Sequence, residues 1–191
     1  MRRIGMTGGI GRGKSVVSRL LRIMGYSVYD TDSEAKRLME SSLEVVQKLS
    51  ECFGRDIYHN GRLNRGLLSS RVFGESDKIV LLNSIVHPVV RFDFYRWSES
   101  LNEEICFVES AILYESRFDE LVDEVWTVTA PEELRISRVR QRSGLTEEEI
   151  KKRMAAQLSE EEKQRRAAHI IWNDGNVSVI HRVLSLLKSL E

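Results

Sequence analysis

The chain has 191 residues with 29 basic and 29 acidic side chains, so its formal net charge at pH 7 is zero. This balance argues against a protein that binds nucleic acid through bulk positive charge. Hydrophobic residues make up 41% of the sequence, which is enough to bury a core, and the length indicates one domain that carries insertions.

Cysteine usage and the apolar runs indicate where such a protein works. Cys52 and Cys106 are the only cysteines, too few for a disulfide scaffold or a metal cluster. No window approaches the roughly 18 apolar residues of a membrane helix, and Arg2 and Arg3 are followed by glycines rather than by a signal-peptide core. We expect a cytoplasmic monomer or weak homo-oligomer with no nucleic-acid or membrane partner.

The chain begins with a strand, a glycine-rich loop and a helix. Ile4–Met6 is a short apolar run, and apolar residues at helical spacing follow the glycines. A second short strand is expected at 27–29, followed by Asp30 and Asp32 and by a helical stretch over 33–39.

The middle of the chain is predicted to be helical. Residues 43–53 are amphipathic, 65–100 predict two or three more helices, and Asn60-Gly61 indicates a turn between them. Loops that join a strand to a helix usually have about two to six residues. This stretch is therefore expected to be a helical insertion.

Three further apolar runs do not alternate with polar residues: 105–108, 125–128 and 170–172. Such runs are typical of strands buried on both faces of a parallel sheet. Thr146 and Ser159 begin capping-box patterns that predict helix starts, and Asn176 is expected to cap a terminal helix. The predicted fold class is α/β, with a five-stranded parallel sheet flanked by helices.

The loop after the first strand satisfies the phosphate-binding pattern G-x-x-x-x-G-K-[ST]. Its residues are Gly8, Gly9, Ile10, Gly11, Arg12, Gly13, Lys14 and Ser15. The loop amides, continuing to Val16, supply partial positive charge, Lys14 reaches the β- and γ-phosphates, and Ser15 can hold Mg²⁺. The pattern predicts a bound nucleotide with Mg²⁺, and by itself it leaves a kinase, a GTPase and a motor ATPase open.

The rest of the sequence narrows the class of nucleotide-binding protein. It contains neither Asn-Lys-x-Asp, which reads guanine, nor Asp-x-x-Gly, which senses a γ-phosphate. A GTPase switch is therefore disfavoured. A small-molecule kinase needs an acceptor pocket and a closing lid, and the chain offers candidates for both.

Three carboxylates are candidates for the chemistry. Asp32 is the expected general base for an acceptor hydroxyl, although it can also be read as a helix N-cap. Asp30 can cap the same helix or hold Mg²⁺ through water. Glu109 ends a buried strand, where nucleotide-dependent enzymes often place an acidic group for Mg²⁺, or it is an ordinary strand-end carboxylate.

Arg135, Arg138 and Arg142 are spaced to share one helical face. Like charges repel there unless anions offset them, and the phosphates of ATP are suitable anions. The alternative is a solvated face paired to nearby glutamates.

At this point several motifs together resemble the dephospho-coenzyme A kinase family, in order and spacing, over essentially the whole chain. They are Met6-Thr-Gly-Gly-Ile-Gly-Arg-Gly-Lys-Ser15, Asp30-Thr-Asp32, His87-Pro88, Ala111-Ile-Leu-Tyr-Glu115, Arg153-x-x-x-Gln157 and Ile171-Trp-Asn173-Asp-Gly175. The resemblance implies ATP-dependent phosphorylation of the ribose 3′-hydroxyl of dephospho-CoA, the last step of coenzyme A synthesis. It also implies a nucleotide-kinase-like core (about 1–42, 101–141 and 167–191), a helical CoA-binding insertion (about 43–100) and a lid (about 142–166).

The resemblance further implies roles for individual residues. Arg142 resembles the family's lid arginine and joins Asp32 and Lys14 as a catalytic residue, and His87 belongs with the substrate insertion. Arg65 is a candidate contact to the acceptor's pyrophosphate, and Asn173 and Gly175 are expected to border the adenine of ATP. Family members usually have Ser where this chain has Arg12, and since the loop binds through its backbone, we expect the Arg12 side chain to project from the loop at little cost.

Two rival functions remain open. A nucleoside monophosphate kinase shares the loop and the lid but phosphorylates a phosphate rather than a ribose hydroxyl. A non-catalytic nucleotide-binding regulator would bind ATP without turnover, with Asp32 serving only as a helix cap.

Overall fold

The computed structural model describes residues 1–190, so Glu191, the last residue of the expected core, lies outside the described residues. The chain forms two compact units, one made of residues 1–29 with the segment from 101 onward, the other of Asp30–Ser100. Each unit is described separately.

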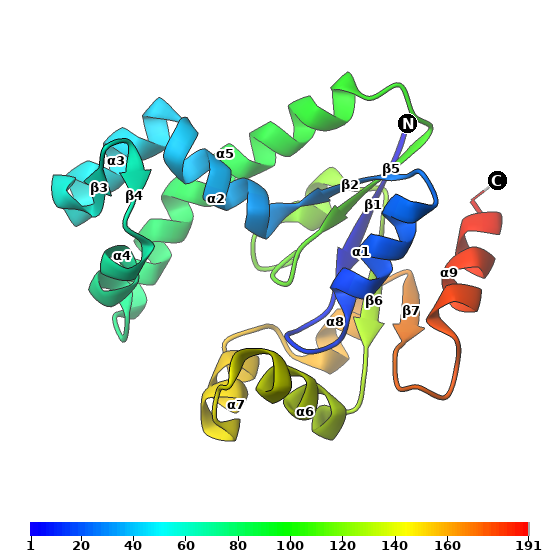
Figure 1. Ribbon diagram of the computed structural model, residues 1–191. Helices are drawn as coiled ribbons and strands as arrows, with labels where there is room; N and C mark the ends of the chain where they lie inside the picture. The colour runs from blue at the N-terminus through cyan, green and yellow to red at the C-terminus, as the bar shows by residue number, and fades with distance from the viewer. Residues whose placement is uncertain (191) are drawn as a thin grey trace. The chain divides into compact units, whose positions relative to one another are not determined.

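The first unit is built on a five-stranded sheet (Figure 1). Its strands are β1 (Arg2–Thr7), β2 (Ser27–Asp30), β5 (Ile105–Glu109), β6 (Glu124–Thr129) and β7 (His169–Trp172). They lie in the order β2-β5-β1-β6-β7, and β1 pairs in parallel with β5 and β6, as β6 does with β7. The predicted α/β class with a five-stranded parallel sheet is confirmed.

Helices cover both faces of this sheet. The helical segments are α1 (Lys14–Ile23), the short 3₁₀ turn η2 (Phe118–Leu121), α6 (Glu132–Ser143), α7 (Glu147–Ala155), α8 (Glu160–Arg166) and α9 (Val179–Lys188). Helices α1 and α9 lie side by side and enclose a core with inward side chains of the central strands, among them Ile4, Phe107 and Trp126. Helix α8 packs on β6 and η2 packs on β1. Burial on both faces explains the unalternating apolar strands.

The second unit is mainly helical. It contains α2 (Thr31–Ser41), α3 (Leu43–Phe53), the 3₁₀ turn η1 (Arg55–Ile57), α4 (Arg65–Val72) and α5 (Ser76–Ser100), with a short hairpin of β3 (Tyr58–His59) and β4 (Arg62–Leu63). Asn60 and Gly61 both have positive φ, 48° and 75°, as the tight turn of this hairpin requires. The predicted turn is confirmed.

Two of the three predicted helix caps are confirmed and one is wrong. Thr146 forms a complete capping box with Glu149, and the Ser159 side chain accepts the Glu162 amide at the start of α8. Helix α9 is capped by Ser178 rather than by Asn176. Asn176 instead donates its backbone amide and its side-chain Nδ2 to the carboxylate of Asp174. Aspartate side chains commonly accept the backbone amide two residues further along the chain.

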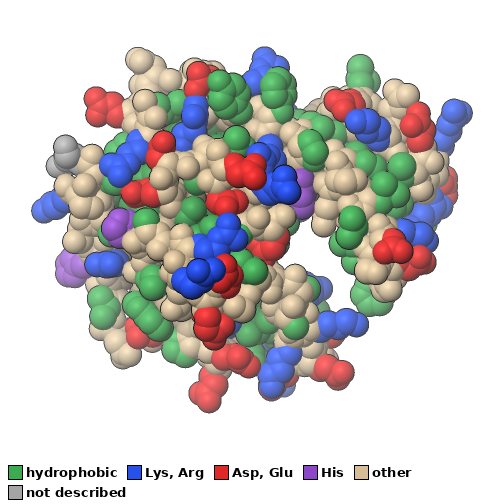
Figure 2. All heavy atoms as spheres, turned by 180° about the vertical axis from the view of Figure 1, so that it is seen from behind, with side chains coloured by type: hydrophobic (Ala, Val, Ile, Leu, Met, Phe, Trp, Pro, Cys, Tyr) green, Lys and Arg blue, Asp and Glu red, His purple; other side chains and the backbone are tan. Residues whose placement is uncertain are grey.

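Basic and acidic side chains are interspersed over the face shown in Figure 2, consistent with the zero net charge. In residues 1–190, no helix combines the length and the apolar character needed to cross a membrane.

Candidate active site

The phosphate-binding loop joins β1 to α1, as its sequence predicts. β1 ends at Thr7 and α1 begins at Lys14, with Gly13 at the N-cap in a left-handed conformation (φ 89°). A Cβ at Gly13 would collide with the side-chain amide of Asn173. Glycine at this position therefore provides both the left-handed turn that begins α1 and the room for Asn173 to approach the loop.

Asn173 holds the loop from the end of β7. Its Nδ2 donates to the Arg12 carbonyl oxygen at 2.8 Å, and its Oδ1 accepts from Arg138 Nη2 at 3.3 Å. The structure thus brings Asn173 and Arg138 to the loop. The expected place of Asn173 beside adenine, with Gly175 in the following bend, stays a prediction.

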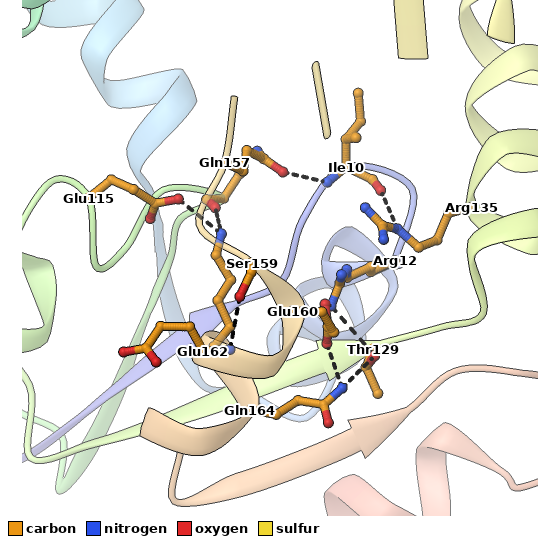
Figure 3. A network of polar contacts seen from close by, with 12 residues as sticks. Ile10, Arg12, Glu115, Thr129, Arg135, Gln157, Ser159, Glu160, Glu162 and Gln164 are labelled. Atoms are coloured by element: carbon orange, nitrogen blue, oxygen red, sulfur yellow. Dashed lines mark hydrogen bonds and ion pairs between the residues drawn. The ribbon is translucent and has the colours of Figure 1, made fainter. Parts of the chain in front are cut away.

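Both backbone groups of Ile10 are held by side chains from distant segments. Gln157 Oε1 accepts the Ile10 amide at 3.1 Å, and Arg135 Nε donates to the Ile10 carbonyl oxygen at 3.1 Å. Burial lowers the pKa of the Arg135 guanidinium, with the nearby Glu132 opposing the shift. Figure 3 shows these side chains converging on the loop. The segment after α7 is therefore docked on the loop.

The Arg12 side chain does not project from the loop, and this expectation is wrong. Arg12 is only 3% exposed, forms an ion pair with Glu160 of α8 and donates from Nη1 to Thr129 Oγ1 at 3.5 Å. Burial lowers its pKa to about 9, the charge of Arg135 contributes to the lowering, and Glu161 opposes it. The guanidinium thus remains protonated at neutral pH.

Glu109 is positioned by a serine of α1. It ends β5 in register with Met6 of β1, the strand that leads into the loop. The fully buried Ser18 donates its hydroxyl to Glu109 Oε2. Ser18 follows Ser15 by three residues, so the Glu109 carboxylate contacts the side of α1 that also carries Ser15.

The Ser15 hydroxyl and the Glu109 carboxylate suit Mg²⁺, which prefers oxygen ligands. In residues 1–190, no group of three or more His, Cys, Asp or Glu side chains is arranged to hold a metal ion. A nucleotide-bound Mg²⁺ does not need such a group, because it takes most of its ligands from phosphates and water. The donor set therefore fits the predicted ion.

Asp30, not Asp32, is the N-cap of α2. Asp30 Oδ1 accepts the backbone amides of Asp32 and Ser33 at 3.0 and 3.3 Å, and its Oδ2 accepts the Ser33 hydroxyl at 2.8 Å. Asp32 lies exposed in the first turn of the helix. The N-cap interpretation of Asp32 is therefore wrong, and its carboxylate is not used for capping.

Three other predicted site residues take no part in the loop contacts described above. Arg142 is exposed near the end of α6. Arg65, in the second unit, begins α4 and pairs with Glu40 of α2 at 3.0 Å. His87 lies inside α5 before Pro88, and burial, aided by the charge of Arg91, lowers its pKa.

Sequence reasoning missed the supporting residues Ser18, Gln157 and Glu160. Ser18 has a usable signal, because its spacing from Ser15 places both on one face of α1. Gln157 belongs to the motif Arg153-x-x-x-Gln157, but the sequence predicted no role for it. Nothing in the sequence pairs Glu160 with Arg12, because their contact depends on how α8 packs.

The chain matches the family model described as dephospho-CoA kinase over residues 2–178. It is 39% identical over 188 residues to a dephospho-CoA kinase of Porphyromonas gingivalis, an alignment that covers 98% of this chain and 93% of the relative. The chain belongs to the dephospho-CoA kinase family. Membership of this kinase family implies the use of ATP, in agreement with the phosphate loop.

Solved structures share the fold of this chain. A crystal structure from Thermus thermophilus has a TM-score of 0.86 at 35% identity and covers 99% of this chain and 97% of that one. A dephospho-CoA kinase from Campylobacter jejuni has a TM-score of 0.74 at 23% identity, with 100% and 98% covered. The second likeness concerns the fold alone.

Proposed function

We propose that this chain transfers the γ-phosphoryl group of ATP to the 3′-hydroxyl of the ribose of dephospho-CoA, giving coenzyme A and ADP. The observation that carries the proposal is the complete phosphate loop between β1 and α1, in a chain that matches the dephospho-CoA kinase model over residues 2–178.

In this proposal the loop and its neighbours bind ATP. Backbone amides from Gly8 to Val16 and the N-terminus of α1 face the phosphates, and Lys14 neutralises charge that develops on the transferred group. Ser15, and Glu109 directly or through water, would hold Mg²⁺, which would supply positive charge that offsets the charge of the phosphates. Asn173 and Gly175 border the adenine.

Asp32 accepts the proton of the attacking hydroxyl. Its carboxylate is exposed in the first turn of α2, and the capping work there belongs to Asp30. An exposed carboxylate that is not committed to the backbone can orient and deprotonate an acceptor. Arg142, on α6, contributes positive charge to the transferring phosphoryl group when the segment 142–166 closes as a lid.

The second unit holds the acceptor. Arg65 is placed at the start of α4, where it can exchange its ion pair with Glu40 for the pyrophosphate of the substrate. Because burial lowers its pKa, His87 is neutral at pH 7 and provides a hydrogen-bonding group for the substrate rather than a charge.

An acceptor screen tests the proposal. ADP release is measured with dephospho-CoA, AMP, CMP and shikimate in parallel. Turnover that depends on dephospho-CoA is expected. Preferred use of AMP or CMP would assign the chain to the nucleoside monophosphate kinases, and ATP binding without turnover on any acceptor would favour a regulator. Cytoplasmic location and a monomeric or weakly associating state stay predictions.

A further inference from the structure

Helix α8 touches the phosphate loop through one face. Glu160, Lys163 and Gln164 are spaced at i, i+3 and i+4 and therefore point to the same side of the helix. Glu160 pairs with Arg12 of the loop, and Gln164 Nε2 donates both to Glu160 Oε1 at 2.8 Å and to Thr129 Oγ1 at 3.3 Å. Figure 3 shows Glu160 and Gln164 beside Arg12 and Thr129.

The same helix is anchored to the segment that follows Glu109. Lys163 Nζ donates to the Ala111 carbonyl oxygen at 2.8 Å and pairs with Glu115 Oε1 at 3.2 Å, and this oxygen also accepts the Leu158 amide at 2.7 Å. Helix α8 thus bridges the phosphate loop and the chain segment that leaves the candidate metal carboxylate.

The two basic side chains of this bridge, Arg12 and Lys163, are buried, so that loss of an acidic partner would leave a buried charge without compensation. Arg12 is 3% exposed and Lys163 is 1% exposed. Burial lowers the pKa of Lys163, and Glu115 opposes the shift. Removing one member of a buried pair leaves an uncompensated charge, which disturbs the surrounding structure more than loss of an exposed pair does.

Arg12 is held at two points. Asn173 binds its carbonyl oxygen and Glu160 pairs with its side chain, so both its backbone and its side chain are fixed immediately before Gly13 and Lys14. We propose that Arg12 is a positioning residue for ATP: through Glu160 it locks the phosphate loop to α8, so that Lys14 and the loop amides are already in place when the phosphates bind. Pre-organisation of this kind lowers the cost of binding, and small misplacements of reacting groups cost about 10²-fold in rate.

The inference rests on the proposed use of ATP, so its test measures ATP binding by calorimetry without an acceptor. Arg12→Ala and Glu160→Ala are each expected to raise the Kd for ATP about tenfold, and the double variant is expected to be no weaker than either single one, because both remove the same contact. Steady-state kinetics should show kcat/KM for ATP falling by about 10²-fold while KM for dephospho-CoA changes little.

Arg165 offers a matched control on the same helix. Its ion pair with Glu162 at 2.8 Å is at the surface, with 73% of the Arg165 side chain exposed. Arg165→Ala should leave the Kd for ATP unchanged, since exposed pairs contribute little. If Arg12→Ala does not fold, Glu160→Gln carries the same test, because it neutralises the partner and keeps its volume.

Arg12→Ala and Glu160→Gln variants that melt at lower temperature but bind ATP within about twofold of the wild type would overturn the inference, since the pair would then be merely structural. Partial recovery of ATP affinity in Arg12→Lys, which keeps the charge, supports it. A wild-type protein that binds ATP without phosphorylating dephospho-CoA contradicts the proposed acceptor and not the role of Arg12.

Discussion

The side chain of Asp30 accepts the backbone amide of Asp32 at 3.0 Å, so the first of two neighbouring carboxylates stabilises the helix and leaves the second available for chemistry. Asp32→Asn should therefore lower kcat by about 10²-fold or more, because it removes a general base without a change in size. The melting temperature and the Kd for ATP should stay close to wild type.

The contrasting change is Asp30→Ala, which removes the cap of α2. Loss of a cap costs about 1 kcal/mol, so the melting temperature should fall by about 2–4 °C in a chain of this length. Asp30→Ser, which retains a capping oxygen, is the matched control. A loss of stability in Asp32→Asn with unchanged activity per folded molecule would reverse the roles assigned to these two residues.

Lys14→Ala should lower kcat by about 10²- to 10³-fold, because the cation that follows the γ-phosphate is lost while the loop amides still hold the nucleotide. Steady-state kinetics with saturating dephospho-CoA measures the effect, and circular dichroism checks the fold. Retention of near wild-type kcat would contradict a kinase mechanism that runs through this loop.

The sequence alone was sufficient for the five strands of the parallel sheet and for the phosphate loop, because both depend on local patterns, whereas of the hairpin β3–β4 it predicted only the turn. Unalternating runs such as 105–108 mark strands buried on both faces, and Gly13-Lys14-Ser15 occupies the strand-to-helix junction that its motif requires. Arg12 was misjudged because its environment is created by Glu160 and Thr129, which only the folded chain brings near.

The assignment of the two aspartates shows the same limit. Asp30 and Asp32 are both suitable N-caps by residue type. The choice depends on where the helix begins, and a shift of two residues lies within the usual uncertainty of a helix boundary. Backbone hydrogen bonds of the folded chain were needed to decide it.

His87 predicts a pH dependence of stability. Burial holds its pKa below the ordinary value of 6.5. When the pH falls below about 6.5, the His87 side chain takes up a proton in the unfolded chain more readily than in the folded chain. The contribution of His87 to the free energy of unfolding is therefore present above about pH 6.5 and is lost as the pH falls further. Melting curves from about pH 7 to about pH 5 should show a shallower decline for His87→Gln than for wild type. Identical slopes would contradict the prediction.

The segment 142–166 should become more protected from hydrogen exchange when an ATP analogue binds. The contacts of Gln157 and Glu160 already dock its C-terminal part on the phosphate loop. The gain is therefore expected mainly at residues 146–157, where exposed charged side chains need the phosphates to hold them in place. Equal protection with and without the analogue would rule out a nucleotide-dependent lid, and peptides from α9 serve as the internal reference.

The most direct test of the central claim is the choice of acceptor. Dephospho-CoA offers an adenosine, a pyrophosphate and a pantetheine arm, whereas AMP lacks both the pyrophosphate and the pantetheine arm. Binding energy from those remote parts can position the 3′-hydroxyl, so truncated acceptors should lose kcat as well as affinity. The measurement is kcat/KM for dephospho-CoA, adenosine and AMP under matched conditions, with the product identified by phosphorus NMR. We predict a preference of about 10³-fold or more for dephospho-CoA, with the new phosphate on the 3′-oxygen, whereas comparable rates on AMP with ADP as the product would contradict the account.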